Sequence, residues 1–260
     1  MTDASSEQHN QLIVDQFTRM AKPFAEMPAH SNEQAMRLLA EAAGVSKEDR
    51  VLDVCCGTGI VACALAPIAR DVTGIDLTPA MLEQARKLQR EAGLENLSWQ
   101  VGDVAAMPFG DEMFSVVVSR YALHHLLEPA RVLQEMARVC RQGGKVVVAD
   151  VFASGVEQGG AYDRVEKLRD PSHVRALRLD EITAMFQAAG MPVSGTTFYR
   201  LTVGLEDLLQ ASATAPDAAE QVRRVLAADV DRNETGMSPK WVDGGIQFSF
   251  PVVVVSATKL

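Results

Sequence analysis

The fold is decided by residues 51–60, VLDVCCGTGI, and by residues 72–76, VTGID, which follow after one short helical stretch. Residues 51–55 form an apolar run that predicts a buried strand; glycines then break the run, and residues 60–69 have a helical pattern. Residues 72–76 predict a second buried strand, which ends at Asp76. This unit predicts an α/β fold in which the first strand ends in a glycine-rich turn that lets a ligand approach the backbone.

The same alternation of strands and helices continues through the first 151 residues. Further strands are expected at residues 97–101, 114–119 and 145–151, with helices between them. Two late strands are expected at residues 193–203 and 247–258, separated by a helical stretch. The pattern predicts a Rossmann-like, doubly wound sheet that is mostly parallel and has helices on both faces.

The length of the chain bounds its domain organisation. A chain of 260 residues is at the upper limit of one hydrophobic core, so one main domain is expected at residues 46–260, with residues 1–45 as an N-terminal helical cap. Insertions at about residues 152–178 and 205–235 follow the sheet pattern, and we expect them to form a lid over the acceptor site. Within the second insertion, residues 205–232 are where a contact with a homodimer partner is expected.

Composition restricts the class of partner. The formal net charge of −9 disfavours nucleic-acid binding, which depends on a basic surface, so a small-molecule substrate is expected. No apolar run approaches the length of about 18 residues that a membrane span needs, and the polar N-terminus has no features of a secretion signal, so the cytoplasm is the expected compartment. The four cysteines suit neither a disulfide scaffold nor a zinc knuckle, and no metal site is expected.

Asp53 distinguishes two cofactor classes that share a glycine-rich turn. Gly57, Gly59 and Ala62 satisfy the loose dinucleotide pattern, and Asp76 is placed to accept from ribose hydroxyls, so an NAD-dependent oxidoreductase has to be weighed. Asp53, however, puts a carboxylate inside the first strand, where a nearby pyrophosphate would make a buried charge more costly. S-adenosylmethionine carries an ammonium and a sulfonium and no phosphate. The sequence therefore favours S-adenosylmethionine over NAD.

Four ordered motifs carry a resemblance to a known family. They are residues 53–59 (DVCCGTG), 74–82 (GIDLTPAML), 102–109 (GDVAAMPF) and 119–126 (SRYALHHL). With these motifs the chain resembles the class I S-adenosylmethionine-dependent methyltransferases, in particular the branch of the ubiquinone and menaquinone C-methyltransferases. The resemblance covers roughly residues 51–151. It implies the class I methyltransferase fold with an antiparallel C-terminal strand, S-adenosylmethionine as cofactor and S-adenosylhomocysteine as its product.

The resemblance also implies a set of cofactor contacts. Asp76 would accept from the ribose hydroxyls, Asp103 would lie at the adenine amine, and Arg120 would lie near the methionine part. The expected cofactor-binding residues are Asp53, Cys56, Gly57, Thr58, Gly59, Asp76, Leu77, Met81, Gly102, Asp103, Val104 and Arg120. Cys55 occupies the position of the family's usual first glycine, so no ligand role is expected for its side chain.

Three histidines are the candidate catalytic residues if the acceptor must be deprotonated, namely His124, His125 and His173. A structural role is the alternative for each of them. Adjacent residues on a helix point about 100° apart, so His124 and His125 are not expected to bind one metal ion. The residues expected to line the acceptor pocket are Tyr162, Arg169, His173, Arg175 and Tyr199.

Taken together, these observations predict an enzyme. We expect an S-adenosylmethionine-dependent methyltransferase that transfers a methyl group to a small-molecule acceptor by in-line displacement. The resemblance alone suggests an aromatic or quinone-like acceptor. Two alternatives stay open, a protein that binds S-adenosylmethionine without methyl transfer and an NAD-dependent oxidoreductase.

Overall fold

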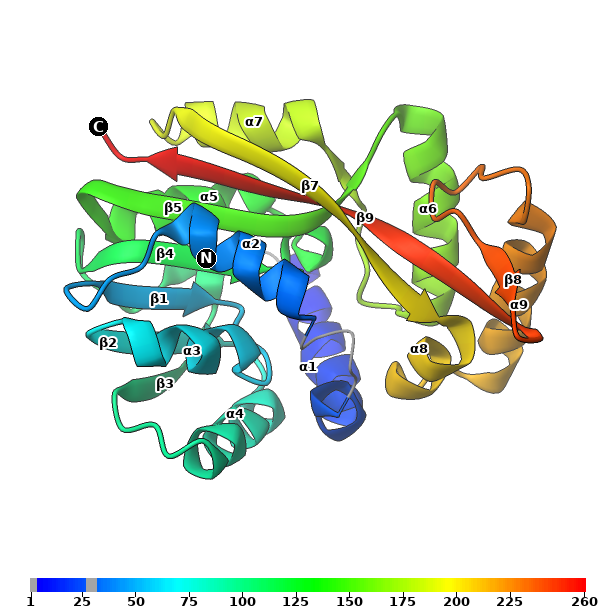
Figure 1. Ribbon diagram of the computed structural model, residues 1–260, viewed down its shortest axis with the longest axis horizontal. Coiled ribbons are helices and arrows are strands. Elements are labelled where there is room, and N and C mark those ends of the chain that lie inside the picture. The colour runs from blue at the N-terminus through cyan, green and yellow to red at the C-terminus, as the bar shows by residue number, and fades with distance from the viewer. Residues whose placement is uncertain (1–3, 27–31) are drawn as a thin grey trace.

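A mixed sheet forms the centre of the computed structural model, which describes residues 4–26 and 32–260 (Figure 1). Residues 1–3 and 27–31 of the predicted cap lie outside the described residues. The sheet has the strand order β3-β2-β1-β4-β5-β9-β7. Its strands are β1 (Arg50–Val54), β2 (Asp71–Asp76), β3 (Leu97–Val101), β4 (Phe114–Arg120), β5 (Cys140–Ala153), β6 (Leu177–Arg178), β7 (Val193–Gly204), β8 (Lys240–Val242) and β9 (Gly245–Thr258).

The strand directions confirm the predicted fold class. Strands β1 to β5 pair in parallel, and β9 runs antiparallel between β5 and β7. The sequence did not predict β6 and β8, because segments of two and three residues are too short to show a periodic pattern. The order of the strands reverses beside β1, so β1 and β4 leave a crevice at their carboxyl ends.

Helices cover both faces of the sheet. They are α1 (Ala4–Ala25), α2 (Glu33–Ala43), α3 (Ile60–Leu65), α4 (Pro79–Glu91), α5 (Pro129–Val139), α6 (Val156–Arg169), α7 (Leu179–Ala188), α8 (Leu205–Ala211) and α9 (Pro216–Asp229). Neighbouring residues of β1 point to opposite faces, so Val51 belongs to the same core cluster as Leu65 of α3, whereas Leu52 belongs to the cluster that contains Leu133 of α5 and Phe186 of α7. No helix in the described part of the chain is long and apolar enough to cross a membrane.

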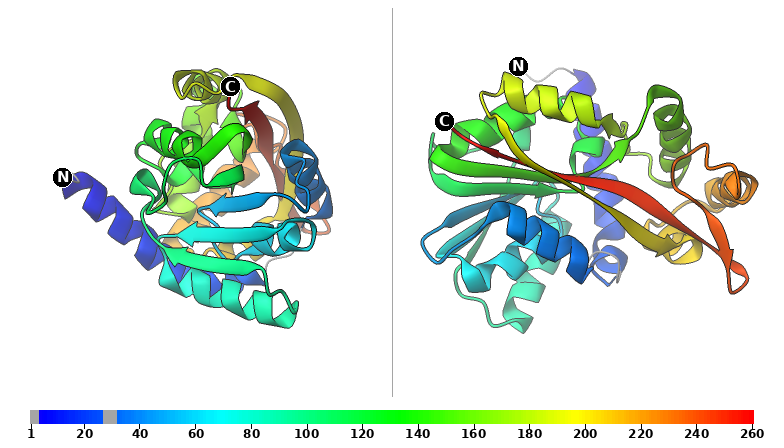
Figure 2. Two further views of the ribbon diagram at one scale, coloured as in Figure 1. Left: turned by 90° about the vertical axis from the view of Figure 1, so that its left-hand side faces the viewer. Right: turned by 45° about the horizontal axis from the view of Figure 1, so that its top comes forward.

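Strands β7 and β9 extend beyond the parallel sheet and carry a small second layer of helices (Figures 1 and 2). Strand β5 pairs with residues 252–258 of β9, while β7 continues to pair with β9 as far as Gln247. The two predicted insertions fold here as α6 and as α8 with α9. Helix α1 contacts α4 and α8, whereas α2 packs against β5, β7 and β9. Within the predicted cap, α2 therefore packs on the sheet, whereas α1 packs against the helices α4 and α8.

Gly59 is where the glycine-rich turn passes closest to a neighbouring element. It has a φ of +78°, and a Cβ built there would lie 2.6 Å from Cη2 of Trp99 and 2.8 Å from Cβ of Ala85. Gly93 has a similar φ of +64°, but a Cβ there would meet no atom within 4 Å. The two positions share backbone strain and differ in steric overlap.

We expect Gly59→Ala to lower the free energy of unfolding by about 1 to 3 kcal/mol more than Gly93→Ala does, since only the first substitution forces Trp99 or α4 to move. Urea denaturation of the two variants measures the difference. Equal losses would show that backbone strain, rather than close packing, requires glycine at position 59.

Candidate active site

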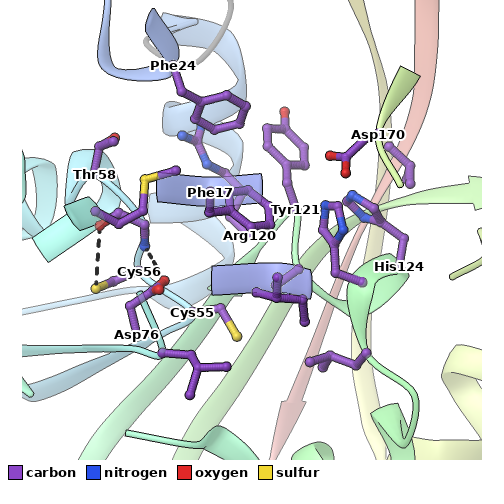
Figure 3. A pocket seen from close by; sticks show the side chains of 18 of the residues that line it. Phe17, Phe24, Cys55, Cys56, Thr58, Asp76, Arg120, Tyr121, His124 and Asp170 are labelled. Carbon is purple, nitrogen blue, oxygen red and sulfur yellow. Dashed lines mark hydrogen bonds between the residues drawn. The ribbon is translucent and has the colours of Figure 1, made fainter. Parts of the chain in front are cut away.

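A cavity lies at the carboxyl ends of β1, β4 and β5, beneath α1 (Figure 3). One half of its wall comes from the turns that follow β1, β2 and β3. The other half comes from the loop after β4, from α6 and from the extension of β7 and β9. Helix α1 closes the cavity with Ile13, Phe17 and Phe24. The cavity therefore occupies the crevice where the sequence places the ligand.

Helix α1 is bound to both halves of the cavity. Asn10 donates from Nδ2 to Asp103 at 3.4 Å, and Nε2 of His9 donates to the backbone carbonyl of His125 at 2.7 Å. Nε2 of Gln16 donates to the backbone carbonyl of Ser212 at 3.0 Å. Since the helix joins three separate segments, it acts as the cover of the cavity.

Asp76 organises the glycine-rich turn. Its carboxylate accepts from the backbone N–H of Gly57 and from that of Thr78, each at 2.8 Å. Burial raises the pKa of Asp76, and these backbone hydrogen bonds oppose the rise. Gly57 has a φ of +53°, and a Cβ there would meet no atom within 4 Å. Asp76 thus holds the turn at Gly57, where no side chain separates the backbone from the cavity.

Asp53 is a buried carboxylate beside this turn. It lies in β1 between Gly74 of β2 and Val118 of β4, and its side chain accepts from the backbone N–H of Ala62 at 3.0 Å. Burial raises the pKa of Asp53 to about 7, against the opposing charge of Arg120. The site therefore binds a cation more readily than a second anion.

Asp103 lies in the turn after β3. This turn belongs to the half of the cavity wall that carries the expected cofactor-binding residues, which we call the cofactor half. Oδ1 of Asp103 accepts from the backbone N–H of Ala105 at 2.9 Å, which fixes the turn after β3 and brings Val104 to the cavity wall. All of the expected cofactor-binding residues line the cavity except Gly59 and Gly102. At Gly102 a Cβ would lie 3.2 Å from Ile75 in the core. Gly59 and Gly102 therefore allow their turns to pack closely on neighbouring residues outside the cavity wall.

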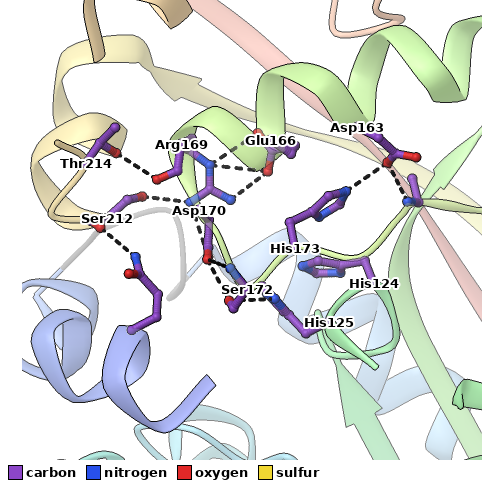
Figure 4. A network of polar contacts seen from close by, with 12 residues as sticks. His124, His125, Asp163, Glu166, Arg169, Asp170, Ser172, His173, Ser212 and Thr214 are labelled. Atoms are coloured by element: carbon purple, nitrogen blue, oxygen red, sulfur yellow. Dashed lines mark hydrogen bonds and ion pairs between the residues drawn. The ribbon is translucent and has the colours of Figure 1, made fainter. Parts of the chain in front are cut away.

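The three candidate histidines lie close together (Figure 4). The rings of His124 and His125 are 4.2 Å apart, and that of His173 is 5.6 Å from His124. His124 and His125 line the cavity, whereas His173 lies behind them and binds Asp163 through Nε2 at 2.8 Å. The described residues contain no group of three or more metal-ligating side chains placed to hold a metal ion.

The sequence reasoning missed Asp150, which holds His124. Asp150 accepts from the backbone N–H groups of Ala122 and Leu123 at 3.0 and 2.5 Å, and Nδ1 of His124 lies 2.5 Å from its other oxygen. Although burial favours the neutral form, Asp150 raises the pKa of His124. Asp150 lies inside the apolar strand β5, so the only available signal was a carboxylate in a buried strand, as at Asp53.

A second polar network lies in the other half of the cavity wall, in which the acceptor is expected and which we call the acceptor half. Arg169 donates to Glu166 at 2.6 Å and to Oγ of Ser212 at 2.7 Å, which joins α6 to the end of α8 (Figure 4). Tyr162 and Arg169 line the cavity as the sequence predicts. The other three residues expected in this wall, His173, Arg175 and Tyr199, lie outside it. Glu166, Asp170 and Tyr121 line it without having been predicted.

The chemistry of the cofactor half fits S-adenosylmethionine. Asp53, Asp76 and Asp103 lie around the backbone of Gly57, while the adjoining apolar wall is formed by Leu77, Met81 and Val104. A pyrophosphate would be repelled by these carboxylates, whereas an ammonium and a sulfonium would be attracted. The apolar residues suit the flat face of an adenine. The same charges therefore do not fit NAD.

Comparison with known proteins supports this assignment. The family profile described as "Methyltransferase domain" matches residues 52–148. The Bacillus subtilis protein named "Uncharacterized methyltransferase YcgJ" is 30% identical over 207 residues, which cover 79% of this chain and 82% of the relative. Its crystal structure superposes with a TM-score of 0.81, covering 88% of this chain and 99% of that one.

Two further matches cover the fold or the central motifs. A demethylmenaquinone methyltransferase of Renibacterium salmoninarum is 35% identical over 114 residues, which cover 44% of this chain and 46% of that protein. A geranyl diphosphate C-methyltransferase of Streptomyces coelicolor, solved with S-adenosyl-L-homocysteine, shares the fold with a TM-score of 0.60 at 13% identity, and covers 88% and 77% of the two chains. The chain belongs to the class I S-adenosylmethionine-dependent methyltransferases.

Proposed function

We propose that the cavity binds S-adenosylmethionine in its first half and a small apolar acceptor in its second, and that it transfers the methyl group between them. The observation that carries the proposal is the continuity of the cavity, whose wall runs from Asp76 and Gly57 past Arg120 to His125. Both reactants would therefore be held under α1 and away from water. Such enclosure and alignment supply much of the acceleration of an in-line displacement.

In the proposed complex, each part of S-adenosylmethionine lies beside a different group of the cofactor half. The backbone of Gly57 and Thr58 would bind the methionine part, with Asp53 and Arg120 as its charged neighbours. Asp76 keeps unused acceptor sites on both oxygens for the ribose hydroxyls, since each oxygen takes one backbone hydrogen bond. Asp103 would accept from the adenine amine. Leu77, Met81, Val104 and Cys56 complete the wall.

The acceptor half carries aromatic side chains beside the charged residues Glu166, Arg169 and Asp170. Phe17, Tyr121, Tyr162 and Phe250 line it, and α6 and α8 close it from the side of the predicted lid. A flat, apolar acceptor would bury most of its surface against these rings. The quinone-pathway enzyme among the relatives acts on such a ring by its name, which supports an aromatic or quinone-like acceptor. A cytoplasmic location and a homodimer with its contact at residues 205–232 remain predictions from the sequence.

The proposed function is tested by turnover. Purified protein is incubated with S-adenosylmethionine and a panel of aromatic acceptors, and formation of S-adenosylhomocysteine is measured. We expect product that depends on the acceptor. Tight binding of S-adenosylmethionine with no product on any acceptor would contradict methyl transfer as the function.

Asp76→Ala is expected to weaken binding of S-adenosylmethionine by about 1 to 3 kcal/mol, because it removes both the ribose acceptor and the group that holds the turn. Asp71→Ala is the matched control, since Asp71 begins the same strand and faces Arg50 and Arg70 at the far end of the sheet. Calorimetric titration measures both affinities. Equal affinities of the two variants would remove Asp76 from the binding site.

A further inference from the structure

A chain of three buried side chains holds the ring of His125. Nδ1 of His125 lies 3.1 Å from Oγ of Ser172, and the same hydroxyl donates to Oδ1 of Asp170 at 2.6 Å (Figure 4). The backbone N–H of Ser172 donates to the same carboxylate oxygen at 2.9 Å. All three residues are less than a tenth exposed. The chain links the cavity wall to the segment that follows α6.

The direction of these hydrogen bonds fixes the tautomer of His125. Burial opposes the ionisation of Asp170, but the neighbouring His125, the guanidinium of Arg169 and the hydrogen bonds from Ser172 hold its pKa below the ordinary value. An ionised carboxylate can only accept, so the single hydroxyl proton of Ser172 points to Asp170. The hydroxyl oxygen must then accept from Nδ1–H of His125. A neutral His125 therefore carries its lone pair on Nε2.

Nε2 of His125 is the ring atom left for a ligand. Within residues 4–26 and 32–260, the hydrogen-bonding contacts of the His125 ring are to Ser172: its hydroxyl lies 3.1 Å from Nδ1, and a backbone hydrogen bond with Ser172 raises the pKa of the ring. Phe17 of α1 packs edge to face on the ring, with centroids 5.1 Å apart, and fixes its orientation. His125 also lines the cavity, so Nε2 is the nitrogen of its ring that we assign to a ligand in the acceptor half.

The surrounding charges keep His125 neutral. Burial lowers its pKa well below the ordinary value, and the charge of His124, held by Asp150, lowers it further, while Asp170 opposes. The titratable and charged groups that face this pair come from several segments: His9 on α1, Asp150 on β5, Glu166 and Arg169 on α6, and Asp170 and His173 after it. A charge on His124, whose ring centroid is 4.2 Å away, disfavours a proton on His125 before the reaction, and Asp170 stabilises the imidazolium that forms during it. His125 is therefore available as a base at neutral pH.

We propose that His125 is the general base of the reaction, that Ser172 and Asp170 position it, and that the acceptor is a phenol or another aromatic hydroxyl compound. The hydroxyl proton moves to Nε2 of His125 while the oxygen bonds to the methyl carbon. The bond from that carbon to sulfur breaks, and its electron pair stays on sulfur, which becomes a neutral thioether. Imidazolium later gives its proton to water. This inference rests on the proposed methyl transfer.

A phenol matches both the wall and the base. Phenols ionise near pH 10, within reach of a histidine base, whereas amines and thiolates can attack without a prior proton transfer of this kind. Tyr121, Tyr162 and Phe250 provide ring faces for the acceptor on the same side of the cavity as His125.

The first test determines which ring nitrogen of His125 carries the proton, and it needs no acceptor. The full chain, labelled with 15N at histidine, is studied by NMR between pH 5.5 and 8 with S-adenosylhomocysteine added. We expect His125 to stay neutral with its proton on Nδ1, and Ser172→Ala to abolish that preference. A proton on Nε2, or a protonated ring at neutral pH, would overturn the relay. Shifts of cofactor-half resonances in the same sample report binding separately, so failure of the proposed function is distinguishable.

The second test uses 2-naphthol, catechol and 4-hydroxybenzoate as hydroxyl probes, with 2-aminonaphthalene and 2-naphthalenethiol as comparators. We expect methyl ethers, and a loss of about 10² to 10⁴-fold in kcat for His125→Asn with KM for S-adenosylmethionine little changed. Ser172→Ala should lower kcat about 10-fold without raising KM. His173→Asn is the control, because it removes a buried histidine of the same cluster from outside the cavity wall. Product on the amine or thiol alone, no product on the three hydroxyl probes, or an unchanged kcat in His125→Asn would overturn the proposal.

Discussion

Arg169→Met is expected to lower the free energy of unfolding by about 3 to 5 kcal/mol, because it leaves the carboxylate of Glu166 buried without its cation. Arg169 is 7% exposed and Glu166 is 2% exposed, and their closest atoms are 2.6 Å apart. The substitution also removes the hydrogen bond from Arg169 to Ser212, which joins α6 to α8. Urea denaturation at neutral pH measures the loss.

The double variant Arg169→Met/Glu166→Leu separates charge from packing. It removes both members of the buried pair and keeps similar side-chain volume, so the part of the loss that comes from the unpaired Glu166 should return, although Asp170, 3.8 Å from Arg169, still loses that cation. If the double variant were as unstable as the single one, the loss would come from Asp170, from packing of the arginine stem and from the contact to Ser212. The charge argument would then be wrong.

Asp53→Asn is expected to make the protein without cofactor more stable at pH 8 by about 3 to 5 kcal/mol, with little change near pH 4. Burial raises the pKa of Asp53 from 3.8 to about 7 in the folded chain. The unfolded chain releases this proton near pH 4, whereas the folded chain holds it to about pH 7. The free energy of unfolding therefore falls as pH rises across this interval in the wild type, and not in the variant.

The same substitution should weaken binding of S-adenosylmethionine at pH 8, since the charge that costs stability attracts the cationic ligand. The amide side chain of the variant still offers an oxygen to the backbone N–H of Ala62, so the turn keeps its hydrogen bond. Urea denaturation across pH 4 to 8, with calorimetry at pH 8, checks both effects. A wild-type stability that does not fall between pH 4 and pH 7 relative to the variant would contradict a buried, neutral Asp53.

The residues expected to bind the cofactor meet at one edge of the sheet because each of them lies within a few positions of a strand end. Asp76 ends β2 and Asp103 closely follows β3, and parallel strands bring such residues to one edge. The acceptor half depends instead on contacts between distant segments. His125 and Ser172 are 47 positions apart, and their contact needs the loop after α6 to return to the end of β4.

The histidines show why a periodic pattern in the sequence could not predict the arrangement of the acceptor half. On an α-helix His124 and His125 would point about 100° apart, but they lie in a short 3-10 helix and their rings are 4.2 Å apart. Asp150 lies in an apolar strand, and Asp170 lies in a polar segment without periodicity, so neither position stood out in the sequence. Their roles follow from burial and hydrogen bonds, which no pattern of residue types records.

Calorimetric titration with S-adenosylmethionine, S-adenosylhomocysteine and NAD, run in parallel on the purified protein, tests most directly whether the acidic glycine turn selects the cofactor by charge. We predict micromolar binding of the first two compounds and none of NAD, with both affinities reduced in Asp76→Ala. Binding of NAD alone would contradict the assignment of Asp53, Asp76 and Asp103 to a cationic nucleoside.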